Sequence, residues 1–466
     1  MRKLLWAAVL SAGALLALWA QDISGVIPGR PTKPRIAVPD FRGSGVAPNL
    51  MNAFNQTLWH DLDFSGQLTM VPKTMYPKTV PQQPSDFRQP PPAPTMQRKR
   101  GQEISVPQTG GGLWFTDWSG PPASTNFLAF GYTALQSGVL VLYGSLFDMS
   151  HPDANPSAQP ISKRYLATTA DENGARQIAH EFAADILKIF GASSLFGTHI
   201  YYVHQTTAHS PKEIWVMDPD GKNQRQITHY NSTSIEPAVS PDGSKIAFTS
   251  YTRGNPAIFV FSVDPVRDLR FYNQVASVNE TPSFTPDGKQ IVYSSSAGHC
   301  CRIYIANLDG SGFRPLTSSQ FIDTEPKVNP KTGSTVLFST GRSGSEQIYI
   351  MTIDGADIQR VSEGNGEASN PCWSPDGQAL AFAWTRGFAA GKFNIFVMQD
   401  PGSHNYVQLT HDEGKNENPS WAPDGTHLAF MSNRTGREQI WTMLANGTQV
   451  TQLTHDGLNF SPAWGK

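Results

Sequence analysis

The stretch Glu236–Ser250, EPAVSPDGSKIAFTS, occurs four times in this chain with small changes. Its copies are TPSFTPDGKQIVYSSS at Thr281–Ser296, NPCWSPDGQALAFAW at Asn370–Trp384 and NPSWAPDGTHLAFMS at Asn418–Ser432. In each copy Pro-Asp-Gly separates two apolar runs. Proline fixes φ, aspartate can bond the backbone two residues on, and glycine accepts a positive φ. The tripeptide therefore predicts a tight turn between two strands.

The copies belong to a longer repeat that has three markers in a fixed order. A proline opens each unit, at spacings of 45, 44, 45, 48 and 43 residues: Pro237, Pro282, Pro326, Pro371, Pro419 and Pro462. An aromatic residue then lies inside an apolar strand: Trp215, Phe259, Tyr304, Tyr349, Phe396 and Trp441. A polar strand ends in threonine or serine: Thr228, Thr317, Ser362, Thr410 and Thr454. About 45 residues with four short strands are typical of a propeller blade.

Two units depart from the pattern, and the two ends of the repeat region complete each other. The unit that opens at Pro237 lacks the third marker near FYNQ, which predicts a degenerate outer strand, and Lys331-Thr332 replaces the aspartate of one turn. Thr198–Thr228 supplies the second to fourth strands of a blade, whereas Ser461–Trp464 supplies only a first strand. We therefore predict an all-β six-bladed propeller over residues 198–466, closed by the C-terminal strand. Closure removes exposed sheet edges.

The chain before residue 198 has a different pattern, which predicts a small α/β domain over residues 33–190. Strand-like runs lie at 34–41, 138–149 and 163–169, and helical periodicity lies at 50–62 and 174–191. Between them, residues 72–107 are rich in proline, so we expect an extended surface loop there.

The first twenty residues predict an export signal. Arg2 and Lys3 precede the uncharged apolar run Leu4–Leu18, and Ala20 offers a small residue for cleavage before Gln21. The alternative is a membrane anchor, but the run is shorter than the ~20 residues that a span needs. We expect cleavage near Ala20 and a mature protein in the periplasm. Hydrophobic residues make up 39% and charged residues 16%, which fits a globular protein, and the net charge of −2 gives no general attraction to nucleic acid or anionic membrane.

The sequence carries none of the catalytic or metal-binding motifs expected of a propeller hydrolase or a metalloprotease. The sequence contains neither G-x-S-x-G nor H-E-x-x-H. His229, His411 and His455 fall on three different predicted blades, and the aspartates of the repeated turns are explained by the turns. We expect no metal, no cofactor and no enzymatic activity. The alternative is an exported propeller hydrolase or lactonase, which would need acids or histidines converging on a metal at the axis.

Three cysteines are present, which is too few for a disulfide framework. They are Cys300, Cys301 and Cys372. Ordinary thiols are the simpler interpretation, and a bridge from Cys300 or Cys301 to Cys372 stays open.

The residues before the repeated prolines predict a binding ring at one mouth of the propeller. They are Glu236, Thr281, Glu325, Asn370, Asn418 and Ser461, and Glu280, Thr324 and Glu417 stand just upstream. This polar ring contains several acids, so it suits the basic and amide groups of a protein partner. The alternative is a ring of polar side chains that is only solvated.

The whole pattern resembles the TolB family of periplasmic proteins of the Tol–Pal system. The resemblance rests on six SPDG-type blades after an α/β domain, with IAVPDF, PQQP and GARQIAHEFAADILKIFG before the propeller, FGTHIYYV at its start and SPAW at its end. It covers nearly the whole mature chain. It implies a monomeric, non-enzymatic scaffold that serves outer-membrane integrity and constriction during cell division.

The resemblance also implies two protein partners. A Pal-type peptidoglycan-associated lipoprotein would bind at the propeller mouth, chiefly at Glu280, Thr281, Thr324 and Glu325. TolA would bind an N-terminal segment, residues 21–32, through Gln21, Asp22, Ile23, Ser24, Gly25, Val26, Ile27 and Pro28. This segment would add as a strand to a partner's sheet or fold back on its own domain.

Overall fold

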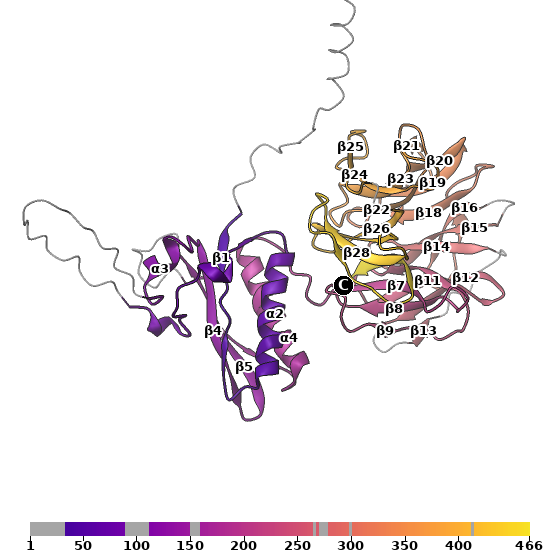
Figure 1. The fold of residues 1–466 in the computed structure, drawn as a ribbon. Coiled ribbons are helices and arrows are strands. Elements are labelled where there is room, and N and C mark those ends of the chain that lie inside the picture. Colours follow the sequence, from indigo (N-terminus) through magenta and orange to yellow (C-terminus); the bar gives the residue numbers. More distant parts are fainter. Residues whose placement is uncertain are drawn as a thin grey trace, which may run out of the picture.

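The computed structural model describes residues 33–88, 111–149, 159–263, 267–269, 278–297, 301–411 and 414–466. The expected export signal, the N-terminal segment 21–32, Cys300 and the later part of the proline-rich segment lie outside these ranges. The described chain forms two domains that stand side by side, and its C-terminus lies on the propeller near the first domain (Figure 1). Within these ranges, no helix is both long enough and apolar enough to cross a membrane.

The first domain is a mixed sheet with two helices on one face. The strand order is β3 (Thr69–Met70), β1 (Arg35–Ala37), β4 (Phe127–Gln136), β5 (Val139–Asp148) and β6 (Ile161–Leu166), and β2 (Arg42–Ser44) also pairs with β4. β1 runs parallel to β3 and β4, whereas β4, β5 and β6 are antiparallel. The helices are α2 (Pro48–Phe64) and α4 (Glu172–Ile189). The α/β class predicted for this region is thus confirmed.

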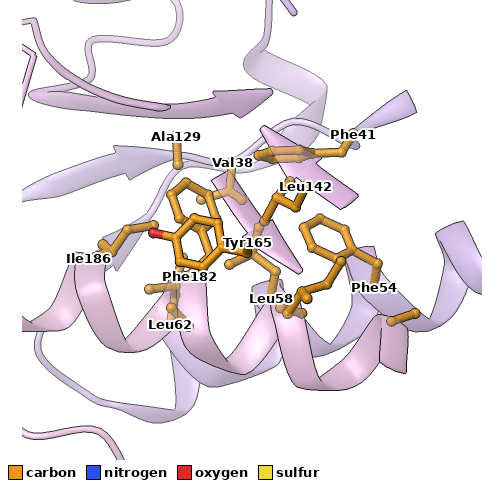
Figure 2. Close-up of a cluster of buried hydrophobic side chains, with 14 of the residues drawn as sticks. Val38, Phe41, Phe54, Leu58, Leu62, Ala129, Leu142, Tyr165, Phe182 and Ile186 are labelled. Carbon is orange, nitrogen blue, oxygen red and sulfur yellow. The ribbon is translucent and has the colours of Figure 1, made fainter. Parts of the chain in front are cut away.

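The core of this domain lies between the helices and the sheet. Phe54 and Leu58 of α2 and Phe182 and Ile186 of α4 are each spaced by four residues, so each pair projects from one helix face. All four side chains are fully buried, and Figure 2 shows them packed together beneath the sheet. Asp171 caps α4 by accepting the N–H of Gly174, which is typical of a helix start.

The proline-rich segment packs closely on the other face of the sheet as far as it is described. It contains the 3₁₀ turns η1 (Lys73–Met75) and η2 (Pro84–Asp86), and helix α3 (Phe115–Ser119) follows the undescribed residues. The ring of Phe87 stacks on Phe115 at 4.6 Å and on Phe147 of β5 at 5.3 Å between centroids. Most of residues 72–88 lie at the surface, but Tyr76, Val80 and Phe87 are partly buried and anchor the segment against a second core.

The second domain is a propeller of six four-stranded sheets. Five blades run outward in chain order, and the sixth starts with the last strand of the chain. Blades one to three are β10 (Ser234–Val239), β11 (Lys245–Arg253), β12 (Asn255–Ser262), β13 (Arg267–Leu269); β14 (Asn279–Phe284), β15 (Gln290–Ser295), β16 (Arg302–Asn307), β17 (Arg314–Pro315); and β18 (Asp323–Val328), β19 (Thr335–Ser343), β20 (Ser345–Thr352), β21 (Gln359–Arg360). Blades four to six are β22 (Ala368–Trp373), β23 (Leu380–Trp384), β24 (Asn394–Met398), β25 (Tyr406–Gln408); β26 (Asn416–Trp421), β27 (His427–Ser432), β28 (Gln439–Leu444), β29 (Thr451–Gln452); and β30 (Leu458–Gly465), β7 (His199–Gln205), β8 (Glu213–Met217), β9 (Arg225–Gln226).

The C-terminal strand closes the ring, as the sequence predicts. β30 pairs with β7, and Trp464 stands opposite Ile200. The innermost strands β10, β14, β18, β22, β26 and β30 contact one another in an unbroken cycle. The outer strand of blade one is Arg267–Leu269, which immediately precedes the FYNQ stretch, and it pairs with β12. This blade therefore also has four strands.

The polar residues that recur in the repeat make the same hydrogen bonds in successive blades. In blade one, Ser240 Oγ donates to Asp242 Oδ1 at 2.6 Å, and the same carboxylate oxygen accepts the N–H of Ser244. In blade three Asn329 takes over this role and accepts the N–H of Lys331. The hydroxyl that ends the outer strand accepts a backbone N–H from the third strand at 2.8–3.1 Å in five blades: Thr228, Thr317, Ser362, Thr410 and Thr454.

Candidate functional site

The innermost strand of every blade carries a β-bulge where its proline is preceded by a polar residue. The pairing register with the second strand shifts at this point in all six blades. The residue before the proline has a φ between 45° and 56° in each blade: Glu236, Thr281, Glu325, Asn370, Asn418 and Ser461. Such values are uncommon for residues other than glycine, and strained backbone of this kind clusters at functional sites.

These six residues, here called the axial ring, meet at the centre of the propeller. Together with Lys327 and four of the neighbouring prolines they line a cavity of about 90 Å³. The structure thus brings together all six positions that the repeat placed before a proline. The backbone bulge is what turns the residues of six separate strands toward one cavity.

Two glutamates of the axial ring bind the next blade. Glu236 Oε2 accepts the N–H of Thr281 at 3.1 Å and the hydroxyl of Thr249 at 3.0 Å. Glu325 accepts both the backbone N–H and the side-chain amide of Asn370 at 2.6 Å. The ring residues therefore hold neighbouring blades together as well as lining the axis.

Several acidic side chains lie close together around the axial ring. Burial raises the pKa of Glu236 to about 7, and the charges of Glu280 and Glu325 act in the same direction. Burial likewise raises the pKa of Glu346 to about 7, with the charges of Glu325 and Glu367 adding to the effect. Carboxylates this close together favour the approach of a cation or of hydrogen-bond donors.

The propeller has two unlike ends, because the turns of an antiparallel meander alternate between them. The mouth face carries the connections from one blade to the next and the hairpins between second and third strands. The domain-side face carries the Pro-Asp-Gly turns. Glu280 and Thr324 each lie one residue before the axial ring, on the side of the mouth face. There Glu280 accepts the hydroxyl of Tyr251 at 3.2 Å, and Thr324 accepts the hydroxyl of Ser294 at 3.3 Å.

An exposed apolar residue beside the ring was not predicted from the sequence. Ile322, in the connection that leads into β18, exposes 63% of its surface, and the adjacent Phe321 exposes 47%. The loop is held in place because Ser319 Oγ donates to Asp323 Oδ2 at 2.7 Å and Arg302 Nε donates to the Ser319 carbonyl. The sequence signal for this exposed site was the apolar pair Phe321 and Ile322 in an otherwise polar connection.

The remaining candidates do not form a chemical centre in the described part of the chain. His229, His411 and His455 lie in three different connections between blades. Across the ranges that the structure describes, no three histidine, cysteine or acidic side chains are grouped to hold a metal ion. Burial raises the pKa of the Cys372 thiol to about 12. The N-terminal positions Gln21–Pro28 lie outside the described residues.

Comparisons with known proteins agree with this architecture. The family model described as TolB beta propeller domain matches residues 187–368 and 359–466. A TolB homolog of Chlorobium luteolum is 32% identical over 66% of this chain and 68% of its own length. The Tol-Pal system protein TolB of Bordetella pertussis is 38% identical over 41% of this chain and 43% of its own length.

A solved structure shows the same fold over both domains. The crystal structure of TolB from Acinetobacter baumannii superposes with a TM-score of 0.72 and 20% identity, and the match covers 93% of this chain and 97% of that one. Because the family model matches more than half of the chain, these findings establish a family and not the fold alone. The chain is a β-propeller component of the Tol–Pal system and belongs to the TolB family.

Proposed function

We propose that the chain is a periplasmic, non-enzymatic scaffold that binds a Pal-type peptidoglycan-associated lipoprotein at its mouth face and TolA through its N-terminal segment. In this role it serves outer-membrane integrity and constriction during cell division. The observation that carries the proposal is the axial ring, six bulged residues around one cavity with an acidic rim and the apolar Ile322 beside it. Polar rims around exposed apolar anchors are typical of protein interfaces.

The environment of the ring acids supports binding over catalysis. A hydrolase or lactonase, the second candidate, would aim its carboxylates at a substrate or metal. Here Glu236 and Glu325 already accept hydrogen bonds from the neighbouring blades. Side chains engaged in this way give the mouth a fixed shape, which suits recognition of a folded partner.

Substitutions on the mouth face are expected to weaken Pal capture. Ile322→Ser alters an exposed apolar side chain, and Glu280→Lys reverses the charge of a half-buried side chain that accepts the hydroxyl of Tyr251 from the neighbouring blade. Each should lower the affinity for the soluble domain of a Pal-type lipoprotein by more than about 1 kcal/mol, roughly fivefold, because one removes an apolar anchor and the other a carboxylate. Isothermal titration calorimetry measures the effect.

Ile358→Ser provides the matched control. Ile358 lies in the same blade, exposes 38% of its surface and stands in the turn between the third and outer strands, on the domain-side face. It should leave the affinity unchanged. Equal affinity for all three variants and the unaltered protein would remove the mouth face from the proposal. Pal that does not bind the unaltered protein would remove the partner itself.

Deleting Gln21–Pro28 is expected to abolish capture of TolA while leaving capture of Pal intact. The proposed segment lies ahead of both domains in sequence, so its loss should not alter the far-ultraviolet circular dichroism spectrum. Co-precipitation of purified proteins measures both interactions in one experiment. Retained TolA binding by the shortened chain would contradict the role given to the segment.

A further inference from the structure

Histidine–aspartate pairs gather where the two domains meet. Four of the twelve histidines of the chain are found there. On the helices, His180 Nδ1 donates to Asp61 Oδ2 at 2.5 Å, and His60 Nδ1 lies 3.7 Å from Asp61 Oδ1. On the propeller the pairs are His199 with Asp218 (3.3 Å) and His427 with Asp424 (2.6 Å).

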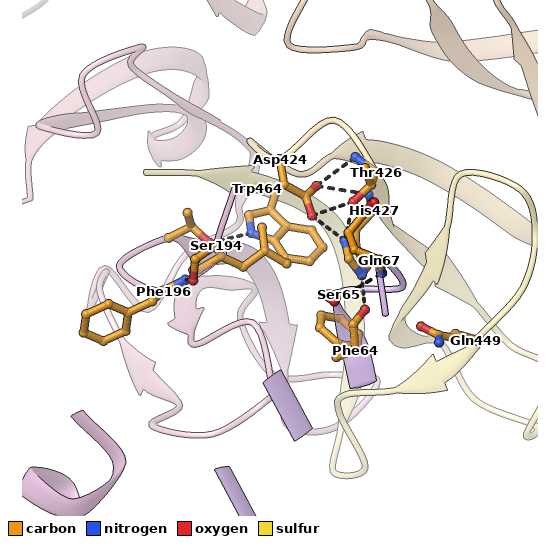
Figure 3. Close-up of polar contacts among 12 residues, drawn as sticks. Phe64, Ser65, Gln67, Ser194, Phe196, Asp424, Thr426, His427, Gln449 and Trp464 are labelled. Atoms are coloured by element: carbon orange, nitrogen blue, oxygen red, sulfur yellow. Dashed lines mark hydrogen bonds and ion pairs between the residues drawn. The ribbon is translucent and has the colours of Figure 1, made fainter. Parts of the chain in front are cut away.

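His427 makes a direct bond between the domains. Its Nε2 lies 2.7 Å from the backbone oxygen of Phe64 at the end of α2, and its Nδ1 faces Asp424 (Figure 3). The imidazole also stacks on the Phe64 ring at 4.4 Å, and its side chain is 1% exposed. A carbonyl and a carboxylate are both acceptors. Only the doubly protonated imidazolium offers an N–H to each of them.

The sequence of the repeat changes at this contact. At the position of His427 the other complete turns have Lys245, Gln290, Thr335 and Ala379. The serine or threonine that holds the turn aspartate in blades one, two and four is Ala422 in blade five. Asp424 instead accepts hydrogen bonds from Thr426 and His427. Burial acts to raise the pKa of Asp424, but these bonds lower it overall, so the carboxylate is charged.

Contacts around this bond are few, and a cavity of about 310 Å³ lies beside it. Gln449 Nε2 donates to the Asp63 carbonyl at 3.3 Å, and the Phe64 ring packs against a propeller cluster that includes Trp464. The cavity is lined by charged or titratable groups of both domains. From the helices come His60, Asp61, Arg176 and His180, and from the propeller His199, Asp218, Asp220, Lys222 and Asp424.

Carboxylates of the propeller raise the pKa of the histidines on the helices across this cavity. Burial acts to lower the pKa of His180, but Asp61, Asp220 and Asp218 raise it overall. The pKa of His60 is also raised, mainly by its hydrogen bond to Asp61, with Asp220 contributing. Part of each increase comes from the other domain, so the docked pair of domains binds protons more tightly than separated domains would.

We propose that the junction between the domains is a pH-sensitive latch, in which His60 and His180, together with the direct bond from His427 to α2, hold the propeller against the helices, and which opens as the pH rises. His60 and His180, whose pKa values are raised in the docked state, stabilise docking fully below pH 6.5, the ordinary value for histidine. The stabilisation is lost as the pH rises through the raised pKa.

Small-angle X-ray scattering of the purified protein between pH 5.5 and 8.5 tests this latch. The radius of gyration should increase with pH, and the ratio of docked to open molecules should fall by up to about tenfold per pH unit for each proton released. Asp424→Asn should stay docked and show a weaker pH response, because a neutral imidazole with its proton on Nε2 then satisfies both partners. His427→Gln should show a weaker response as well.

His404→Gln is the control, since His404 lies 4.0 Å from Glu363 on another blade and is 41% exposed. It should retain the response of the unaltered protein. An unchanged radius of gyration for the unaltered protein across this pH range would overturn the proposal. So would a full pH response in Asp424→Asn. Far-ultraviolet circular dichroism at each pH confirms that a change in radius reflects domain separation and not unfolding.

Discussion

Replacing Trp464 with alanine is expected to destabilise the protein by about 3–5 kcal/mol, the usual range for removing a buried tryptophan. Trp464 is 7% exposed, its indole N–H donates to Thr198 Oγ1 at 3.0 Å, and its backbone N–H donates to Ser420 of the neighbouring blade. The side chain therefore links the last strand of the chain to the first strand of the propeller and to blade five. Urea unfolding followed by circular dichroism measures the change in free energy.

Trp373→Ala separates the effect of closure from the effect of the cavity. Trp373 occupies the same place in blade four, two residues after the proline, and is also 7% exposed with its indole N–H bonded to a backbone carbonyl. Its strand is joined by a short turn to the second strand of the same blade, whereas β30 and β7 lie at opposite ends of the propeller sequence and meet only through noncovalent contacts. Trp464→Ala should therefore cost more. Equal losses of stability in the two variants would show that the blade closed by β30 and β7 is no weaker than the other blades.

The repeat made the propeller predictable. Pro-Asp-Gly turns, the aromatic third strand and the terminal threonine recur because each supplies a bond that every blade needs, such as Thr228 Oγ1 to the N–H of Ile214. Six blades and closure by Ser461–Trp464 followed from counting these markers. The axial positions also followed, because the residue before each proline has the same backbone conformation in every blade.

The sequence did not reveal those features of the structure that occur only once in the chain. The central strand β4 is buried on both faces and reads FLAFGYTALQ, which lacks the alternation of a half-exposed strand. The packing of Phe87 depends on Phe115 and Phe147, which are distant in sequence. The direction of Glu325 toward Asn370 depends on the bulge, and the partner of His427 belongs to another domain. Such contacts are set by tertiary structure, which a local pattern does not encode.

Replacing Arg342 with alanine is expected to cost about 3–5 kcal/mol of stability, because it leaves a buried charge without its counter-ion. Arg342 Nη2 donates to Asp323 Oδ1 at 2.9 Å, and Asp323 is fully buried. The guanidinium also lies over the rings of Phe338 and Tyr349, 5.1 and 5.2 Å from their centroids. Thermal and urea unfolding of the single variant measure the loss.

The propeller contains its own control for this ion pair. In blade five Arg434 repeats the arrangement over Phe430 and Trp441, but its Nη2 donates to Asn416, an uncharged residue. Arg434→Ala should cost only roughly 1–2 kcal/mol, since it removes hydrogen bonds to Ser432 and Asn416 and the cation–π contacts with Phe430 and Trp441 but leaves no buried charge without a partner.

A double-mutant cycle then isolates the charge itself. Asp323→Asn gives blade three the asparagine that blade five has at Asn416, so Arg342→Ala in that background should cost about as little as Arg434→Ala. A loss as large as in the native background would mean that Arg342 acts through its packing on Phe338 and Tyr349 and not through the buried carboxylate. The position is informative because Asp323 also anchors the connection that presents Ile322. Unpairing this carboxylate should therefore weaken Pal capture by a variant that is still folded, whereas Arg434→Ala should not.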